Sequence, residues 1–159
     1  MAIVEPTTIA HDSMLTVDTD DLYWLGLLQS QMFAAWVRAV GGRIKDDPRI
    51  SAEMTYNTFP WPQAVGAAAQ DRVRAATSAM LDVRAVHTDV ALEHLYDPLS
   101  IPRGLVIAQR AIDRAVDDLY GRGHFDELKR AAKLFELYAT AIGQLDATHP
   151  KRRRRRAAA

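Results

Sequence analysis

Cysteine is absent from the 159 residues of this chain, which excludes disulfide bonds and thiolate metal sites. Long apolar runs are absent too, since no stretch approaches the length that spans a membrane. The N-terminus lacks the basic and hydrophobic regions of a secretory signal. We therefore expect a protein without membrane contact that is soluble and cytoplasmic.

Signatures of catalysis are also missing. The five histidines are scattered, and only His87 lies on an apolar helical face, where a structural histidine is more common than a metal ligand. The glycines form no phosphate-binding loop, and no Ser-His-Asp grouping occurs. Acidic pairs such as Asp46-Asp47 are adjacent rather than facing. The residues thus indicate no catalytic, cofactor-binding or metal site in this chain.

The chain is nevertheless 48% hydrophobic, which is enough to build a core. Its formal net charge of zero conceals an uneven distribution. Six of the 20 basic residues are Lys151 to Arg156, so the rest of the chain has 14 basic and 20 acidic residues and a net charge of −6. We expect residues 149–159 to be a disordered basic tail that is attracted to phosphate without reading sequence, or one that only aids solubility.

The first part of the chain mixes extended and helical patterns. Ala2–Val4 and Met14–Val17 are candidate edge strands. A helix is predicted from Asp21 to Gly41, because one apolar face recurs at three- and four-residue steps and carboxylates precede it. Residues 43–59 read as extended chain, in which Pro48 favours an edge strand or a turn and Met54–Phe59 is the better strand.

After the Phe59-Pro60-Trp61-Pro62 block the pattern is helical only. Apolar periodicity predicts helices over 67–87, 105–119 and 125–145, with a short turn or helix at 92–96. We assign the chain to a mostly α, α+β class: an N-terminal helix with short strands in 1–62, then a three-helix-type bundle in 63–148. Trp36 should lie in the core, and Trp61 should either cap the junction of the two parts or stack on a ligand.

Charged residues alternate between the glycine pair and the aromatic block. On an extended backbone Lys45, Asp47 and Arg49 would share one face. A solvated strand edge, where charges prevent edge pairing, is the simplest explanation. The alternative is a DNA-reading set, in which Lys donates to guanine, Asp accepts from the cytosine amino group, and Arg reads a neighbouring base or holds a phosphate.

A family resemblance bears on this choice. The stretch YWLGLLQSQMFAAWVRAVGGRIKDDPRISAEMTYNTFPWP resembles the end of the target recognition domain of MmeI-like type IIL restriction–modification proteins. LYDPLSIPRGLVIAQRAIDRAVDDLYG and FDELKRAAKLFELY resemble the helical C-terminal domain of that family. The two sets of motifs are fairly specific together. They cover most of the chain except the first twenty or so residues and the tail.

The resemblance implies that Lys45, Asp47 and Arg49 match the residues with which this family contacts the bases of its site. Pro48 and Ile50 stand where the family pattern has a tyrosine-rich strand. The adenine-binding motif, the S-adenosylmethionine loop and the nuclease motif of the family do not occur here, so S-adenosylmethionine and Mg²⁺ are expected only in other domains.

The leading hypothesis is a DNA-recognition and scaffold fragment of an MmeI-like adenine-N6 DNA methyltransferase. Its partners would be double-stranded DNA and a methyltransferase-bearing chain. The alternative is a non-catalytic helical interaction module, or a decayed gene fragment, with a nonspecific basic tail. A free half of a recognition domain should leave part of the stripe formed by Leu25, Trp36 and Val40 uncovered, which favours partner binding or poor solubility.

Overall fold

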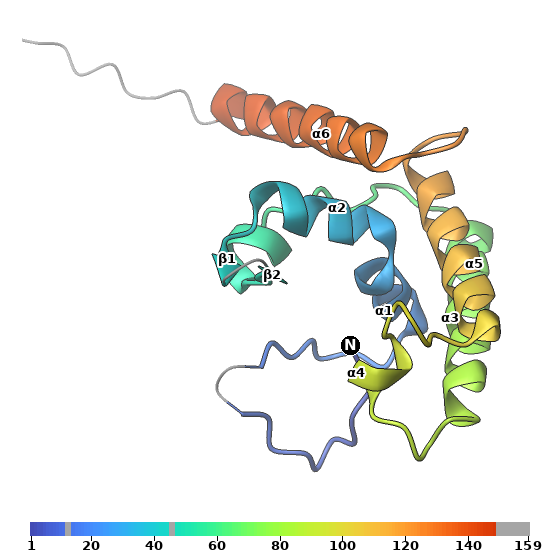
Figure 1. Cartoon of the computed structure of the whole chain (residues 1–159). Coiled ribbons are helices and arrows are strands. Elements are labelled where there is room, and N and C mark those ends of the chain that lie inside the picture. The colour runs from blue at the N-terminus through green and yellow to red at the C-terminus, as the bar shows by residue number, and fades with distance from the viewer. Residues whose placement is uncertain (12–13, 45–46, 149–159) are drawn as a thin grey trace, which may run out of the picture.

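The computed structural model describes residues 1–11, 14–44 and 47–148. Helices account for most of these residues, and a single pair of short strands is the only sheet among them (Figure 1). The prediction of a mostly α fold is therefore confirmed. Lys45 and the predicted disordered tail, residues 149–159, lie outside the described residues. In the described segments, every helix is too short or too polar to cross a membrane.

The N-terminal segment follows an irregular path below the helices (Figure 1). A turn is held by the Thr8 amide, which donates to the Glu5 carbonyl at 2.9 Å. Apolar side chains along the segment are exposed, and Ile9 is 96% exposed. The edge strands predicted at Ala2–Val4 and Met14–Val17 are wrong, because no described neighbouring strand pairs with this backbone.

Two helices replace the single long helix that the apolar stripe predicted. Helix α1 spans Leu22–Gln29 and α2 spans Gln31–Val40, separated by Ser30 in an extended conformation. The Ser30 hydroxyl accepts from the Phe33 amide at 3.3 Å and donates to the Leu27 carbonyl at 2.7 Å. Ser30 thus bonds one unpaired backbone group at the end of α1 and one at the start of α2, so interrupting the helix costs little free energy. The apolar face runs on from α1 to α2 across this bend.

Short elements follow α2, which ends at Gly41 as predicted. Strands β1 (Arg43–Ile44) and β2 (Asp47–Pro48) precede a π-helical turn, η1 (Ala52–Tyr56). The strand predicted over Met54–Phe59 is therefore wrong. The Ser51 hydroxyl accepts from the Met54 amide at 3.1 Å, and the Thr55 hydroxyl donates to the Ser51 carbonyl at 2.7 Å. Such local bonds satisfy the backbone in a turn and compete with strand pairing.

The helices after Pro62 match the apolar periodicity. They are α3 (Ala67–Ala85), α4 (Leu92–Leu95), α5 (Arg103–Tyr120) and α6 (Glu127–Thr148). Helices α3 and α5 run antiparallel and pack with α1, whereas α6 lies mainly across α2 (Figure 1). The predicted three-helix grouping thus differs in one respect, since α6 covers the N-terminal half of the chain instead of α3 and α5.

One apolar core joins the two halves of the chain. Trp36 is 1% exposed, its ring lies against Phe135 and Tyr138 of α6, and its indole N–H donates to the Thr58 hydroxyl at 3.2 Å. The prediction that Trp36 belongs to the core is confirmed. The other fully buried apolar side chains include Leu27, Met32, Val73, Met80, Leu105, Ile112 and Leu134.

The aromatic-proline block closes the junction between the halves. Trp61 packs edge-on against Trp24, Tyr56 and Phe59, with ring centroids 4.8 to 5.3 Å apart. The Tyr120 hydroxyl donates to the Pro60 carbonyl at 3.0 Å, and burial raises the pKa of that phenol. Of the two roles expected for Trp61, capping the junction is the one that the structure shows.

Two carboxylates of α5, of which Asp117 is buried and Asp113 half-buried, hold the neighbouring helices. The Asp117 carboxylate accepts two bonds from the Arg130 guanidinium of α6, at 2.9 and 2.7 Å. Asp113 accepts from the amide of Gln31 at 2.8 Å and so caps the start of α2, while burial raises the pKa of that carboxyl. These contacts fix α2 and α6 on α5, and α2 in turn carries the strands.

Candidate nucleic-acid interface

The charged segment forms a hairpin rather than one extended strand. β1 pairs antiparallel with β2, with Arg43 opposite Pro48 and Ile44 opposite Asp47, so the chain reverses between residues 44 and 47. The Arg49 amide donates to the Gly42 carbonyl at 2.8 Å and extends the pairing by one step. We refer to residues 42–44 and 47–49 as the ribbon. The extended chain expected over residues 43–59 is thus interrupted by a reversal, while Pro48 lies in an edge strand, which is one of the two outcomes expected for it.

The register of the ribbon still places two of the three predicted residues together. Side chains alternate between the two faces of a strand, and directly opposite residues share a face. Asp47 and Arg49 therefore lie on one face, with Gly42 opposite Arg49. Arg43 and Pro48 lie on the other face. Lys45, the third residue, lies outside the described residues, so its position relative to the pair stays a prediction.

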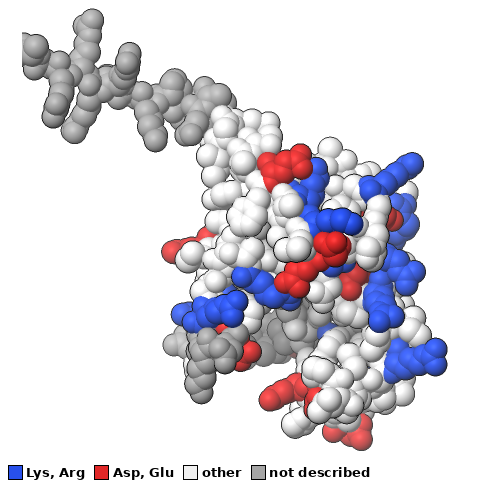
Figure 2. Space-filling view, turned by 45° about the horizontal axis from the view of Figure 1, so that its top comes forward, with Lys and Arg blue, Asp and Glu red and all other residues white. Residues whose placement is uncertain are grey.

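Both described charges are open to solvent. Asp47 and Arg49 are exposed, and within the described residues neither forms an ion pair with another side chain. Gly42 has open space where a side chain would project. An acceptor and a planar five-donor group thus share one face of a narrow two-stranded element. Figure 2 shows basic and acidic side chains interspersed over one face of the molecule rather than gathered in a single basic patch.

The root of the ribbon is held close to the end of α2. A Cβ atom placed on Gly41 would lie 2.4 Å from the Val37 carbonyl oxygen and 2.9 Å from that of Arg49. The backbones meet here only because residue 41 has no side chain. Sequence reasoning treated Gly41 solely as a helix stop and missed this role. A pair of glycines directly before a charged strand was the available signal.

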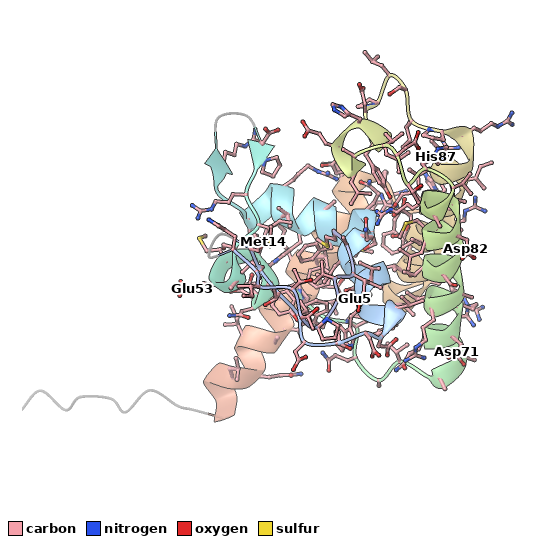
Figure 3. The ribbon with its side chains drawn as sticks, turned by 90° about the horizontal axis from the view of Figure 1, so that it is seen from below. Glu5, Met14, Glu53, Asp71, Asp82 and His87 are labelled. Atoms are coloured by element: carbon pink, nitrogen blue, oxygen red, sulfur yellow. The ribbon has the colours of Figure 1, made fainter. Side chains whose placement is uncertain are left out.

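Acidic and histidine side chains are spread over the described part of the fold. Asp71 and Asp82 lie along α3 with His87 just beyond its end, while Glu53 lies on η1 on the opposite side (Figure 3). No three His, Asp or Glu side chains among the described residues are grouped so as to hold a metal ion. His87 is half-buried, in agreement with a structural role.

Comparison with known proteins identifies the lineage of this architecture. The MmeI target recognition domain matches residues 1–63, which contain the ribbon. The MmeI C-terminal domain matches residues 65–146, which contain α3 to α6. The chain belongs to the MmeI family. The resemblance inferred from the sequence motifs is thereby confirmed.

Two MmeI relatives show how much of such a protein this chain represents. DNA methyltransferase A of Bacillus subtilis (strain 168) is 32% identical over 139 residues, which are 87% of this chain and 16% of that protein. The structure of the type IIL restriction–modification enzyme MmeI in complex with DNA is 37% identical, with a TM-score of 0.74, over 79% of this chain and 17% of that one. The chain therefore spans about a sixth of the length of these relatives.

Proposed function

We propose that this chain is a DNA-recognition and scaffold part of an MmeI-like restriction–modification methyltransferase. Asp47 and Arg49, together with Lys45, read base edges, and the helices hold the ribbon in place without doing chemistry. The observation that carries this proposal is that an exposed acidic residue, Asp47, and an exposed basic residue, Arg49, lie on one face of the ribbon. The ribbon lies within the part of the chain that matches a target recognition domain. The related MmeI structure, solved with DNA, supports it.

The chemistry of the pair fits the edges of a G·C base pair. The major groove of B-DNA admits a two-stranded ribbon. A carboxylate accepts from the cytosine amino group, and an arginine or lysine donates to guanine O6 and N7, each worth ~1–3 kcal/mol of discrimination. Methyl transfer itself requires S-adenosylmethionine, which we place in the methyltransferase-bearing part of the protein. Incubated alone with S-adenosylmethionine and DNA, this chain should transfer no methyl group above background.

A binding assay on duplex DNA over a series of salt concentrations tests the role of the ribbon. The Asp47→Ala/Arg49→Ala double variant removes one acid and one base and leaves the net charge unchanged. Asp118→Ala/Arg110→Ala makes the same change at exposed positions of α5 and is the matched control. We expect the ribbon variant alone to lose preference among sequences selected from a random duplex pool by the wild-type chain.

Deleting Lys151 to Arg156 separates the tail from the ribbon. Loss of the tail should weaken binding to all sequences alike and reduce the salt dependence, because phosphate contacts carry no base information. If the tail deletion abolishes all affinity and the ribbon variant binds like its control, nonspecific attraction by the tail replaces the proposed function.

An interaction module is the second candidate, and the exposed apolar side chains of the N-terminal segment favour it. Ile3, Ile9 and Met14 are all more than half exposed. The stripe named for this role is mixed, since Trp36 is covered by α6 while Leu25 and Val40 are half-buried. Protein binding without any sequence preference for DNA in the assay above would favour this candidate.

A further inference from the structure

An apolar groove lies directly behind the face of the ribbon that carries Asp47 and Arg49. It has a volume of about 330 Å³. One side is formed by the end of α1 and by α2, and the other by Pro48 of β2 and by Ile50. Its apolar lining consists of Met1, Leu28, Phe33, Ala34, Val37, Pro48 and Ile50. The odd-numbered residues 47 and 49 are absent from this lining, as the alternation of side chains along a strand requires.

The polar side chains at the groove are already engaged within the chain, and that of Gln29 donates to the Met1 carbonyl at 3.2 Å. The Ser30 hydroxyl is bonded at the helix break, and the Arg38 guanidinium donates to Glu127 at 2.6 Å and to Gln31 at 3.2 Å. Phe33 and Val37 form a buried floor, whereas Ile50 at the rim is 42% exposed. With these side chains engaged and most of its lining apolar, the groove is suited to apolar side chains.

We propose that this groove docks an apolar segment of the methyltransferase-bearing polypeptide of an MmeI-like protein, and that the docked segment braces the ribbon. The inference rests on the proposed function. Relatives of this chain hold more than four-fifths of their length outside the matched region. Met1 lines the groove and falls within the target recognition domain match, so the groove belongs to the recognition part of the chain.

Bracing matters because the ribbon has little support of its own. It consists of two residue pairs and one further backbone bond, from Arg49 to Gly42, and isolated two-stranded ribbons are only marginally stable in water. A segment packed against Pro48 and Ile50 would press on the back of β2 and the chain after it. Occupation of the groove therefore holds Asp47 and Arg49 in a fixed register for DNA.

Docking is tested in trans with DNA methyltransferase A of Bacillus subtilis from which the region matched by this chain has been deleted. The affinity of the wild-type chain for this probe is compared with that of Ile50→Glu, which places a carboxylate in the groove. Ile107→Glu is the matched control, since Ile107 is 56% exposed on α5 and lies outside the groove. We expect at least tenfold weaker binding, roughly, for Ile50→Glu and unchanged binding for the control.

A second variant guards against a folding effect. Ala34→Phe places an aromatic ring in the groove from its half-buried helical wall and should weaken docking by a similar, roughly tenfold factor. Helical circular dichroism should match that of the wild type for every variant used. Wild-type affinity in both Ile50→Glu and Ala34→Phe, or no association of the wild-type chain with the probe, would overturn the inference.

Hydrogen exchange tests the bracing itself. On addition of the probe, exchange of the Arg49 amide should slow by about tenfold, because its bond to Gly42 opens less often. Unchanged exchange in the docked complex refutes bracing. Failure of the proposed function gives a different result. If Ile50→Glu weakens docking but Asp47→Ala/Arg49→Ala leaves the sequence preference for DNA intact, docking at the groove is supported and base reading by Asp47 and Arg49 is refuted.

Discussion

Adding one methyl group at Gly41 should disturb the ribbon, whereas the same change at Gly42 should not. A Cβ atom at Gly41 would lie 2.4 Å from the Val37 carbonyl oxygen, about 1 Å closer than ordinary van der Waals contact. That oxygen is fixed in α2 and accepts a hydrogen bond from the Gly41 amide at 2.8 Å, so residue 41 itself must shift. The Arg49 carbonyl oxygen, which would lie 2.9 Å from the new atom, must give way as well. Such overpacking costs about 1–3 kcal/mol.

Gly42 is the internal control because its Cβ would meet nothing within 4 Å. Gly42→Ala restricts the unfolded chain and should stabilise the protein by about 0.4–1 kcal/mol. Gly41→Ala gains the same entropic stabilisation, but the overpacking cost exceeds it and the variant should be less stable than the wild type. The two neighbouring glycines should therefore respond with opposite signs.

Thermal unfolding followed by circular dichroism measures both changes. For a chain of this length, the overpacking at Gly41 alone corresponds to a Tm lower by roughly 2–12 °C, of which the entropic gain offsets roughly 1–4 °C. Hydrogen exchange of the Arg49 amide should be faster in Gly41→Ala and unchanged in Gly42→Ala. If Gly41→Ala unfolds at or above the wild-type Tm with the same Arg49 exchange, the close approach of α2 to the ribbon is refuted.

Two ion pairs give further predictions. Arg130→Ala should destabilise the chain by about 3–5 kcal/mol in urea unfolding, because it leaves the Asp117 carboxylate buried without its partner; the side chains are only 13% and 11% exposed. A loss below about 1 kcal/mol would contradict this. The Arg74 guanidinium lowers the pKa of Asp21 from 3.8 to about 2. The ionised Asp21 carboxylate therefore stabilises the folded state above a pH of roughly 4, and this contribution is lost as the pH falls toward 2. Asp21→Asn keeps a capping oxygen for α1 and should reduce the change in the free energy of unfolding between these two pH values. If this change with pH is the same in the variant and the wild type, Asp21 is not the group responsible for it.

The helical half of the fold was readable from the sequence, because its helices each present one apolar stripe with a clear end. The stripe of α5 leads to Leu105 and Ile112 in the core and stops at Gly121, whose φ of 150° favours glycine. The break at Ser30 was not readable, since the apolar spacing continues through it. Only the paired bonds of its hydroxyl reveal that two helices share one stripe.

The candidate site was predictable in part. Alternation places Asp47 and Arg49 on one face of β2 and the residue after it, as it does along any strand, and their role in DNA reading stays a prediction. The reversal of the chain between residues 44 and 47 did not follow, since it depends on the backbone of α2 and on Gly41. The η1 turn was also missed, because β propensity at Met54–Phe59 yields to side-chain bonds made by Ser51 and Thr55. The groove behind the ribbon needs tertiary contacts and leaves no local pattern.

Mapping of methylated sites tests the central claim most directly. The chain is joined to DNA methyltransferase A of Bacillus subtilis in place of the region that it matches, and the methylated positions are read across a genome. The double variant Lys45→Asp/Asp47→Lys, which exchanges the two residues, should redirect methylation to sites that differ at one base pair. The control variant Arg110→Ala should leave the methylated sites unchanged. Identical methylated sites before and after the exchange would contradict the assignment of base reading to this ribbon.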